Sequence, residues 1–115
     1  MRPSNHTGSY YAASINKETN YPVLQGDYNA DVCIIGAGFS GVSAALHLSE
    51  LGYKVIIIEA NKVGWGASGR NGGEIIGGFS GDDIMLKKYG SDYDDLIWDM
   101  RWEGNEIIRK NVEKY

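Results

Sequence analysis

Several features that would assign a protein to a particular class are scarce in this sequence. Cys33 is the one cysteine, so no disulfide can form within the chain, and no apolar run approaches the roughly 20 residues of a membrane span. The excess of acidic over basic residues, 15 against 11, gives no electrostatic reason to expect a nucleic acid or an anionic membrane as partner. The N-terminus has no signal-peptide apolar core. We therefore expect a cytoplasmic protein with no membrane span, no nucleic-acid partner and no metal site.

The length and composition allow one small globular domain. A chain of 115 residues buries about two-thirds of its unfolded surface, and 43% hydrophobic with 23% charged residues is ordinary for a soluble protein. Residues 1–30 are polar and turn-rich, and we interpret them as an N-terminal arm with one short helical turn around residues 10–15. Residues 31–115 are then the folded part of the chain.

A glycine-rich turn between two apolar segments is the most informative pattern. Residues 32–41 read VCIIGAGFSG, and the same register continues through a helical pattern and a second apolar run to Glu59. Gly36 permits a tight turn, Gly38 lets the backbone approach a pyrophosphate, and Gly41 lets helix and strand pack closely. This spacing predicts a dinucleotide-binding turn rather than a glycine turn of some other α/β protein.

The segments on either side of this turn predict a β-α-β unit. Residues 31–35 and 54–59 are nearly continuous apolar runs, which is typical of parallel strands that are covered on both faces. Such a strand would bury Cys33 as a small apolar residue. The helix between the strands is expected over about 39–51, and it ends at Gly52, a good C-terminal cap.

Two positions in this unit predict how a dinucleotide would lie. The unsatisfied N–H groups of the helix that begins near Phe39 favour the negative charge of a pyrophosphate. Glu59 ends the second strand, where its carboxylate can accept hydrogen bonds from both hydroxyls of an adenosine ribose. The same carboxylate would repel the 2′-phosphate of NADP, so the pattern argues against that cofactor.

A second glycine-rich region follows, over residues 64–81. Its glycine density argues against a second crossover helix and indicates a loop that lies close against a large flat or phosphorylated ligand. Ile75, Ile76 and Phe79 are interleaved with the glycines, so we predict a buried, ligand-lining segment rather than a flexible surface loop. The region holds eight of the chain's 16 glycines: Gly64, Gly66, Gly69, Gly72, Gly73, Gly77, Gly78 and Gly81.

A long helix is predicted from Ser91 to the end of the sequence, with Ser91 as its N-cap. Trp98 and Trp102 lie one turn apart, on nearly the opposite side from the apolar stripe, which indicates either a partly exposed aromatic pair or a helix covered on two faces. No internal repeat is visible. The stripe consists of Tyr93, Leu96, Ile97, Met100, Ile107 and Ile108.

Both glycine-rich regions carry a family resemblance. Together with residues 9–13 (SYYAA), the turn at 36–41 and the segment 64–73 (GWGASGRNGG) resemble the N-terminal part of the D-amino-acid oxidase-like FAD-dependent amine oxidoreductases. Within that family the sequence is most similar to the gamma-glutamylputrescine oxidase group. The resemblance implies an α/β fold of the Rossmann type that binds FAD, here its N-terminal portion, in which helices flank a parallel sheet.

The resemblance also implies which residues bind FAD. The first turn would hold the pyrophosphate, Glu59 and its neighbour Ala60 the adenosine ribose, and the second loop the rest of the diphosphate, the ribityl chain and the isoalloxazine. The cofactor-binding residues are therefore expected to be Gly36, Ala37, Gly38, Phe39, Ser40, Gly41, Glu59, Ala60, Ala67, Ser68, Arg70, Asn71, Gly72 and Gly73.

Two further expectations concern the charge and the attachment of the cofactor. Arg70 is the one cation between Lys62 and Lys87, so it is placed to offset diphosphate charge, although an ordinary surface salt bridge is the alternative. Some relatives attach the flavin covalently through Cys or His. Neither residue type occurs in residues 64–81, so we expect FAD to bind noncovalently.

In the complete enzyme the resemblance implies oxidation of a C–N bond in an amine substrate, such as gamma-glutamylated putrescine. Hydrogen peroxide would be a product, and we name no catalytic acid or base. Relatives run to several hundred residues, so we expect residues 31–115 to be the N-terminal part of the FAD-binding domain, with the substrate domain absent from this chain. Two alternatives remain: an NAD-dependent dehydrogenase, which shares the first glycine turn, and a catalytically inactive truncated remnant.

Overall fold

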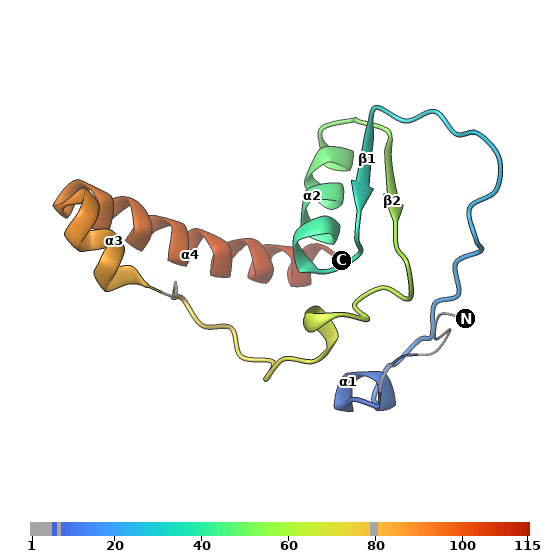
Figure 1. Ribbon diagram of the computed structural model, residues 1–115, viewed down its shortest axis with the longest axis horizontal. Helices are drawn as coiled ribbons and strands as arrows, with labels where there is room; N and C mark the ends of the chain where they lie inside the picture. Colours follow the sequence, from blue (N-terminus) through green and yellow to red (C-terminus); the bar gives the residue numbers. More distant parts are fainter. Residues whose placement is uncertain (1–5, 7, 79–80) are drawn as a thin grey trace. The chain divides into compact units, whose positions relative to one another are not determined.

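The computed structural model describes residues 6, 8–78 and 81–115, which form two compact units, residues 1–72 and residues 73–115 (Figure 1). Among these described residues, none of the helices has the length and apolar character needed to cross a membrane. The elements in chain order are α1 (Tyr10–Ala13), β1 (Val32–Ile35), α2 (Phe39–Glu50), β2 (Val55–Ile58), the 3-10 turn η1 (Ala67–Gly69), α3 (Asp82–Tyr89) and α4 (Ser91–Lys114).

The first unit contains a β-α-β motif with a parallel sheet, as the sequence predicts. β1 and β2 pair in parallel from Val32 opposite Val55 to Ile35 opposite Ile58, with α2 as the connection between them. A parallel pair needs such a crossover, because the chain must return to the same end of the sheet. The carboxyl ends of both strands therefore lie on the side where α2 begins (Figure 1).

The end of α2 also lies where the sequence predicts it. Gly52 adopts a left-handed conformation with φ of +90°, immediately after the last residues of the helix. The Gly52 N–H donates to the Ser49 carbonyl and the Tyr53 N–H to the Leu48 carbonyl, both at 3.0 Å. These two bonds form a Schellman cap, which satisfies carbonyl groups that a helix end leaves free.

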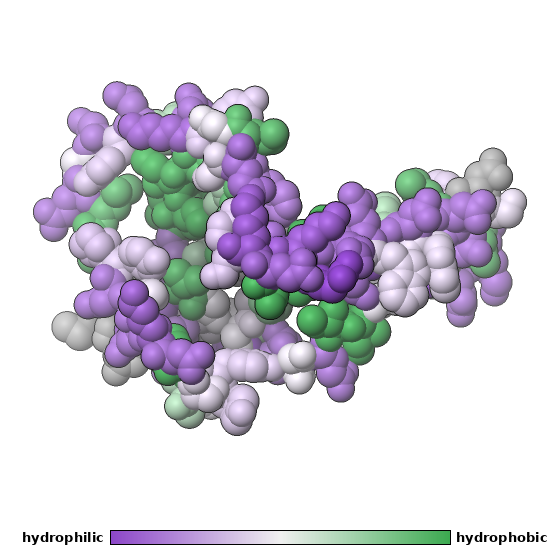
Figure 2. Space-filling view, turned by 180° about the vertical axis from the view of Figure 1, so that it is seen from behind, coloured by the Kyte–Doolittle hydropathy of each residue, from purple (hydrophilic) through white to green (hydrophobic). Residues whose placement is uncertain are grey.

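The prediction that both faces of this sheet are covered is wrong within the first unit. Ile34 faces α2 and is half-buried, whereas Cys33 and Ile35 point to the other face and are exposed, Ile35 by 89%. Neighbouring side chains of a strand point to opposite faces, so a single packed helix can cover one set only. Apolar surface is accordingly visible over the sheet in Figure 2.

The N-terminal arm has one helical turn, α1, as expected. The hydroxyl of Ser9 accepts the backbone N–H of Ala12 at 3.2 Å, which caps this turn. Further along, Glu18 forms an ion pair of 2.6 Å with Lys62, the residue that follows β2 by a few positions. This contact lowers the pKa of the Glu18 carboxyl, through its hydrogen bond and charge interaction with Lys62, and ties the arm to the β-α-β motif.

The second unit is a pair of helices, of which the sequence predicts only α4. α3 and α4 meet at Gly90, whose φ of +82° belongs to the left-handed region. Gly90 is the N-cap of α4 and Ser91 its first residue, so the prediction that Ser91 caps the helix is wrong. A glycine fits this position because L side chains rarely adopt that conformation.

The apolar stripe predicted on α4 is buried in part. Ile97 is buried and Tyr93 and Ile107 are half-buried, whereas the other stripe residues, Leu96, Met100 and Ile108, are exposed. Trp98 and Trp102 stack edge to face with ring centroids 5.7 Å apart, and both are more than half exposed. Within the second unit the helix therefore presents apolar surface on both faces, and the tryptophans form the partly exposed aromatic pair that is one of the two sequence-based interpretations.

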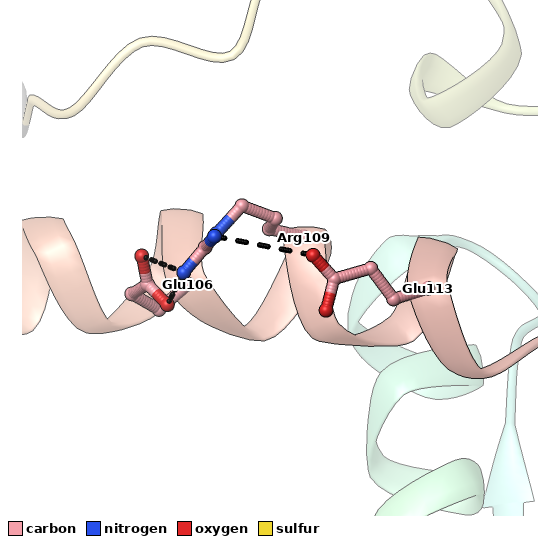
Figure 3. A network of polar contacts seen from close by, with 3 residues as sticks. All are labelled: Glu106, Arg109 and Glu113. Carbon is pink, nitrogen blue, oxygen red and sulfur yellow. Dashed lines mark hydrogen bonds and ion pairs between the residues drawn. The ribbon is translucent and has the colours of Figure 1, made fainter.

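Charged residues occupy the solvated part of α4. Arg109 forms a 2.6 Å ion pair with Glu106 and a longer one of 3.9 Å with Glu113 (Figure 3). Residues three and four positions apart are neighbours on a helix surface, so these pairs support the helix locally. All three side chains are exposed, and such pairs add little to the stability of a fold.

The burial predicted for the second glycine-rich region is also wrong. Ile75 and Ile76 are exposed by 63% and 72%, and Phe79 lies outside the described residues. Gly77 lies against α4, since a Cβ there would be 3.7 Å from the Cβ of Arg101. Gly77 is therefore a point of contact with α4, whereas the two isoleucines before it are exposed.

Candidate dinucleotide-binding site

The first glycine turn joins the end of β1 to the start of α2. Gly36 has a φ of +100°, which a side chain would disfavour, and Gly38 is the N-cap of α2. A Cβ at Gly41 would overlap the carbonyl oxygen of Gly36 and lie 3.3 Å from Cγ2 of Ile34. The close approach of helix and strand expected at Gly41 is therefore present, and it brings the first N–H groups of α2 to the edge of the sheet.

Glu59 is attached to this turn by its carboxylate. Oε2 accepts the backbone N–H of Ala37 and Oε1 that of Asn61, both at 2.8 Å. These bonds, the one from Ala37 first, lower the pKa of the Glu59 carboxyl below its ordinary value, because they stabilise the ionised form. The two oxygens of an ionised carboxylate have about four acceptor positions together, so the carboxylate can still accept a hydrogen bond from a ligand hydroxyl.

A second turn repeats the glycine spacing of the first. Residues 64–69 read GWGASG, the same G-x-G-x-x-G pattern as residues 36–41, which read GAGFSG. Gly64 has a φ of +70°, Gly66 is the N-cap of η1, and a Cβ at Gly69 would overlap the carbonyl oxygen of Gly64. This repeated spacing, rather than the number of glycines, is the signal in the sequence that predicts a second turn of the same kind.

The two turns lie directly against each other. The Gly64 N–H donates to the Ala37 carbonyl at 2.9 Å, and the Phe39 N–H donates to the Ser68 hydroxyl at 2.9 Å. η1 is accordingly located at the end of the sheet where β1 meets α2 (Figure 1). The arrangement places two glycine backbones, the α2 N-terminus and the Glu59 carboxylate at one site.

Arg70 and Asn71 are held on the second turn. The Arg70 guanidinium lies 4.7 Å from the ring centroid of Trp65 and donates from Nε to the Gly66 carbonyl at 3.2 Å. Nδ2 of Asn71 donates to the carbonyls of Ala67 and Ser68 at 3.3 and 3.0 Å. Arg70 is exposed, and no carboxylate of the described residues forms an ion pair with it, so its charge is available to a ligand.

The structure brings together most of the residues that the sequence predicts for this site. Gly36–Gly41, Glu59, Ala60 and residues 67–72 all belong to the first unit, whereas Gly73 is the first residue of the second. Within the first unit, the backbone bonds between the two turns explain how segments far apart in sequence meet. The turns offer N–H groups, a stacked guanidinium and one carboxylate, which suit a ligand with phosphates and a ribose.

An apolar groove between α2 and β2 has a different character. It is open to solvent, has a volume of about 310 Å³ and is lined by one hydroxyl-bearing residue among apolar ones: Val42, Ala45, Leu46, Ser49, Val55 and Ile57. No charged group lines it, so it lacks the polar groups that would orient a dinucleotide. The glycine turns and Glu59 are therefore the candidate site of this unit.

Comparison with known proteins gives matches over nearly the whole chain. The family described as DAO, FAD dependent oxidoreductase, matches residues 31–115. The chain is 46% identical over 111 residues to the gamma-glutamylputrescine oxidoreductase of Escherichia coli strain K12, a match that covers 96% of this chain and 26% of that protein. It is 49% identical over 111 residues to the protein named Probable oxidoreductase OrdL of Haemophilus influenzae, with the same coverage. The chain thus spans about a quarter of the length of these relatives, and no solved structure matches it.

Proposed function

Because the chain belongs to the DAO family of FAD-dependent oxidoreductases, we propose that it is the FAD-binding N-terminal segment of an amine oxidoreductase. The observation that supports this most strongly is the pair of glycine turns joined at the α2 N-terminus beside Glu59. We also propose that the protein is located in the cytoplasm.

The residues of the site fit FAD by their chemistry. The first turn has no side chain at Gly36, Gly38 or Gly41, and Cβ atoms at the last two would meet neighbouring atoms, so the backbone itself forms the surface. Free N–H groups at a helix N-terminus suit a diphosphate, and the remaining acceptor positions of Glu59 suit the two hydroxyls of an adenosine ribose. Arg70 adds a positive charge that can neutralise part of the diphosphate.

FAD held by the two glycine turns, Glu59 and Arg70 would supply the redox chemistry, which is two-electron oxidation of the C–N bond of an amine with oxygen as the final acceptor and hydrogen peroxide as a product. The oxidised substrate would be an imine, and its hydrolysis by water would give an aldehyde or ketone with release of ammonia or an amine. The residues of this chain contribute binding and orientation. Glu59, the two turns and Arg70 fix the ADP half, and the backbone that follows Asn71 is proposed to lie along the flavin half.

The substrate class is proposed from similarity alone. One relative is named gamma-glutamylputrescine oxidoreductase, and it aligns with 96% of this chain. A gamma-glutamylated diamine is therefore the first substrate to test. We propose that FAD binds noncovalently, because residues 64–81 contain neither Cys nor His.

The proposal is tested with the protein expressed from its complete reading frame. Peroxide formation with gamma-glutamylputrescine is followed beside the flavin content of the purified protein, with Gly41→Ala as the cofactor-site variant. We expect bound FAD and peroxide in the wild type and loss of both in the variant. Turnover that needs added NAD and proceeds without bound flavin would contradict the proposal and support a nicotinamide-dependent dehydrogenase.

The segment of residues 1–115 alone is expected to bind FAD weakly and to form no peroxide. Its first unit leaves one face of the sheet open, with Ile35 exposed by 89%, and its second leaves Trp98 and Trp102 exposed. Exposed apolar surface of this kind promotes association and aggregation. A cooperative thermal melt of residues 1–115 with bound FAD and turnover would contradict this expectation.

A further inference from the structure

We propose that Ser68 is a positioning residue that caps α2 and couples the two glycine turns, and that the absence of a side chain at Gly38 leaves room for the Ser68 hydroxyl in its capping position. This inference rests on the proposed function, since its main consequence is for FAD binding. Gly38, the second glycine of the first turn, would then border the Ser68 side chain as well as any bound ligand.

The geometry around the Ser68 oxygen carries the proposal. The Phe39 N–H donates to Oγ of Ser68 at 2.9 Å, although the two residues are 29 positions apart. A Cβ built on Gly38 would lie 2.9 Å from the same oxygen, closer than real Cβ atoms ordinarily approach another atom. The same Cβ would lie 3.9 Å from the Cβ of Ser68, which is ordinary van der Waals contact. The conflict is therefore with the hydroxyl alone.

The N-cap residue of α2 cannot cap the helix with a side chain of its own. Gly38 is the N-cap of α2 and has no side chain, so the first N–H groups of the helix need partners from elsewhere. Ser68 supplies one from the second turn. A serine hydroxyl has one proton to donate besides its acceptor positions, so Ser68 can accept from Phe39 and still donate to a ligand oxygen.

The second turn keeps another attachment when this hydroxyl is removed. Gly64 donates to the Ala37 carbonyl at 2.9 Å, a bond between backbones that no side-chain substitution deletes. Ser68→Ala therefore leaves the turns in contact and deletes the hydroxyl, both as the cap of α2 and as a donor to a ligand oxygen. Gly38→Ala removes the cap by another route, because the new methyl group pushes the Ser68 hydroxyl away from the Phe39 N–H.

The two substitutions are thus expected to be non-additive. In the wild-type background, Gly38→Ala loses the cap, whereas in the Ser68→Ala background the cap is already absent and the 3.9 Å spacing leaves room for the methyl group. Loss of a side-chain N-cap corresponds to a factor of about 2 to 30 in an equilibrium constant. Because the diphosphate is proposed to lie on the α2 N-terminus that this cap orders, we expect Ser68→Ala to weaken FAD binding by at most about this factor.

A double-mutant cycle on FAD affinity tests the coupling, using the protein from its complete reading frame. The factor by which Gly38→Ala lowers FAD affinity is expected to be at least about threefold smaller in the Ser68→Ala background than in the wild type. Ser43→Ala is the matched control, because Ser43 is an exposed serine on α2 whose carbonyl, not its hydroxyl, contacts His47. If Gly38→Ala lowered FAD affinity by the same factor in both backgrounds, the proposal would be overturned.

Amide exchange at Phe39 in the FAD-free protein provides a second readout that does not depend on the ligand. The proposal predicts a protected Phe39 amide in the wild type and in Ser43→Ala, and faster exchange in Ser68→Ala and Gly38→Ala. Unchanged exchange in Ser68→Ala would overturn the positioning role. If the wild type binds no FAD, the proposed function fails while this measurement still decides the role of Ser68. If it binds FAD and the cycle is additive, only this inference fails.

Discussion

Replacement of Glu59 by glutamine is expected to destabilise the fold even without a ligand. Both carboxylate oxygens accept a backbone N–H at 2.8 Å, from Ala37 on one side and Asn61 on the other. A glutamine side chain has one acceptor oxygen and one NH₂ group at these positions. Whichever way the amide is turned, its NH₂ group faces an N–H donor, so one of the two bonds must be lost.

The size of the effect follows from the bonds involved. A hydrogen bond to a charged group contributes about 1.5–3 kcal/mol, and one between neutral groups about 0.5–1.5 kcal/mol. Glu59→Gln deletes one charge-assisted bond and reduces the other to a neutral one. Because the side chain is only half-buried, water can take over part of the lost interaction, and we expect a loss of about 2 kcal/mol in the free energy of unfolding.

The pH dependence of this difference identifies the carboxylate as its cause. The pKa of Glu59 is lowered in the folded protein, chiefly by the hydrogen bonds from Ala37 and Asn61. A group whose folded pKa is depressed stabilises the fold above its unfolded pKa, and this stability is lost as the pH falls through the folded value. The difference in the free energy of unfolding between the wild type and Glu59→Gln should therefore be largest near neutral pH. It should shrink as the pH falls below the ordinary pKa of a glutamate side chain.

Denaturant unfolding of the ligand-free protein at several pH values measures both quantities. Glu103→Gln is the control, because Glu103 is exposed on α4 and forms no hydrogen bond with any residue that the structure describes. We expect the unfolding midpoint of this control to follow that of the wild type. A Glu59→Gln variant as stable as the wild type at neutral pH would refute the reasoning, as would a stability difference that is independent of pH.

The remaining predictions concern the ligand and the arm. Glu59→Ala should weaken FAD binding by about 1–3 kcal/mol and lessen the preference for FAD over NADP, which competitive titration measures. Gly41→Ala should yield a protein without flavin absorption bands and with a lower melting temperature, because its Cβ would overlap the Gly36 carbonyl. Lys62→Ala should make the arm around Glu18 more susceptible to limited proteolysis, because the 2.6 Å ion pair is lost, while FAD affinity changes less than twofold.

Local patterns in the sequence are sufficient to predict the β-α-β motif. The apolar runs before Gly36 and Glu59 and the glycine at position 52 each specify an element or its end, and the structure has β1, α2 and β2 within one residue of the predicted bounds. These signals depend on neighbouring residues only. That is why they can be interpreted without knowledge of the tertiary structure.

Burial and capping were harder to predict, because they depend on residues elsewhere in the chain. Cys33 is exposed because its strand has a packed helix on the other face, and no local pattern reveals which layers cover a strand. Gly90 replaces Ser91 as the N-cap of α4, since a left-handed glycine already turns the chain there. α3 was missed because it is short and begins directly after a glycine-rich region.

The candidate site shows the same division between local and long-range information. The first turn and the carboxylate at position 59 follow from one familiar spacing. The contact of Ser68 with Phe39 joins residues 29 positions apart, and the bond of Glu59 with Ala37 joins residues 22 apart. Both contacts depend on how the first turn meets segments that follow β2, which no local pattern reveals, although the glycine spacing at residues 64–69 repeats that of the first turn.

A structure of the protein with FAD tests the central claim most directly, through the distance between the Glu59 carboxylate and the hydroxyls of the adenosine ribose. The account predicts a hydrogen-bond distance of about 2.5–3.0 Å, with the diphosphate at the α2 N-terminus beside both glycine turns. A ribose bound away from Glu59, or a diphosphate that does not contact the first turn, would contradict it.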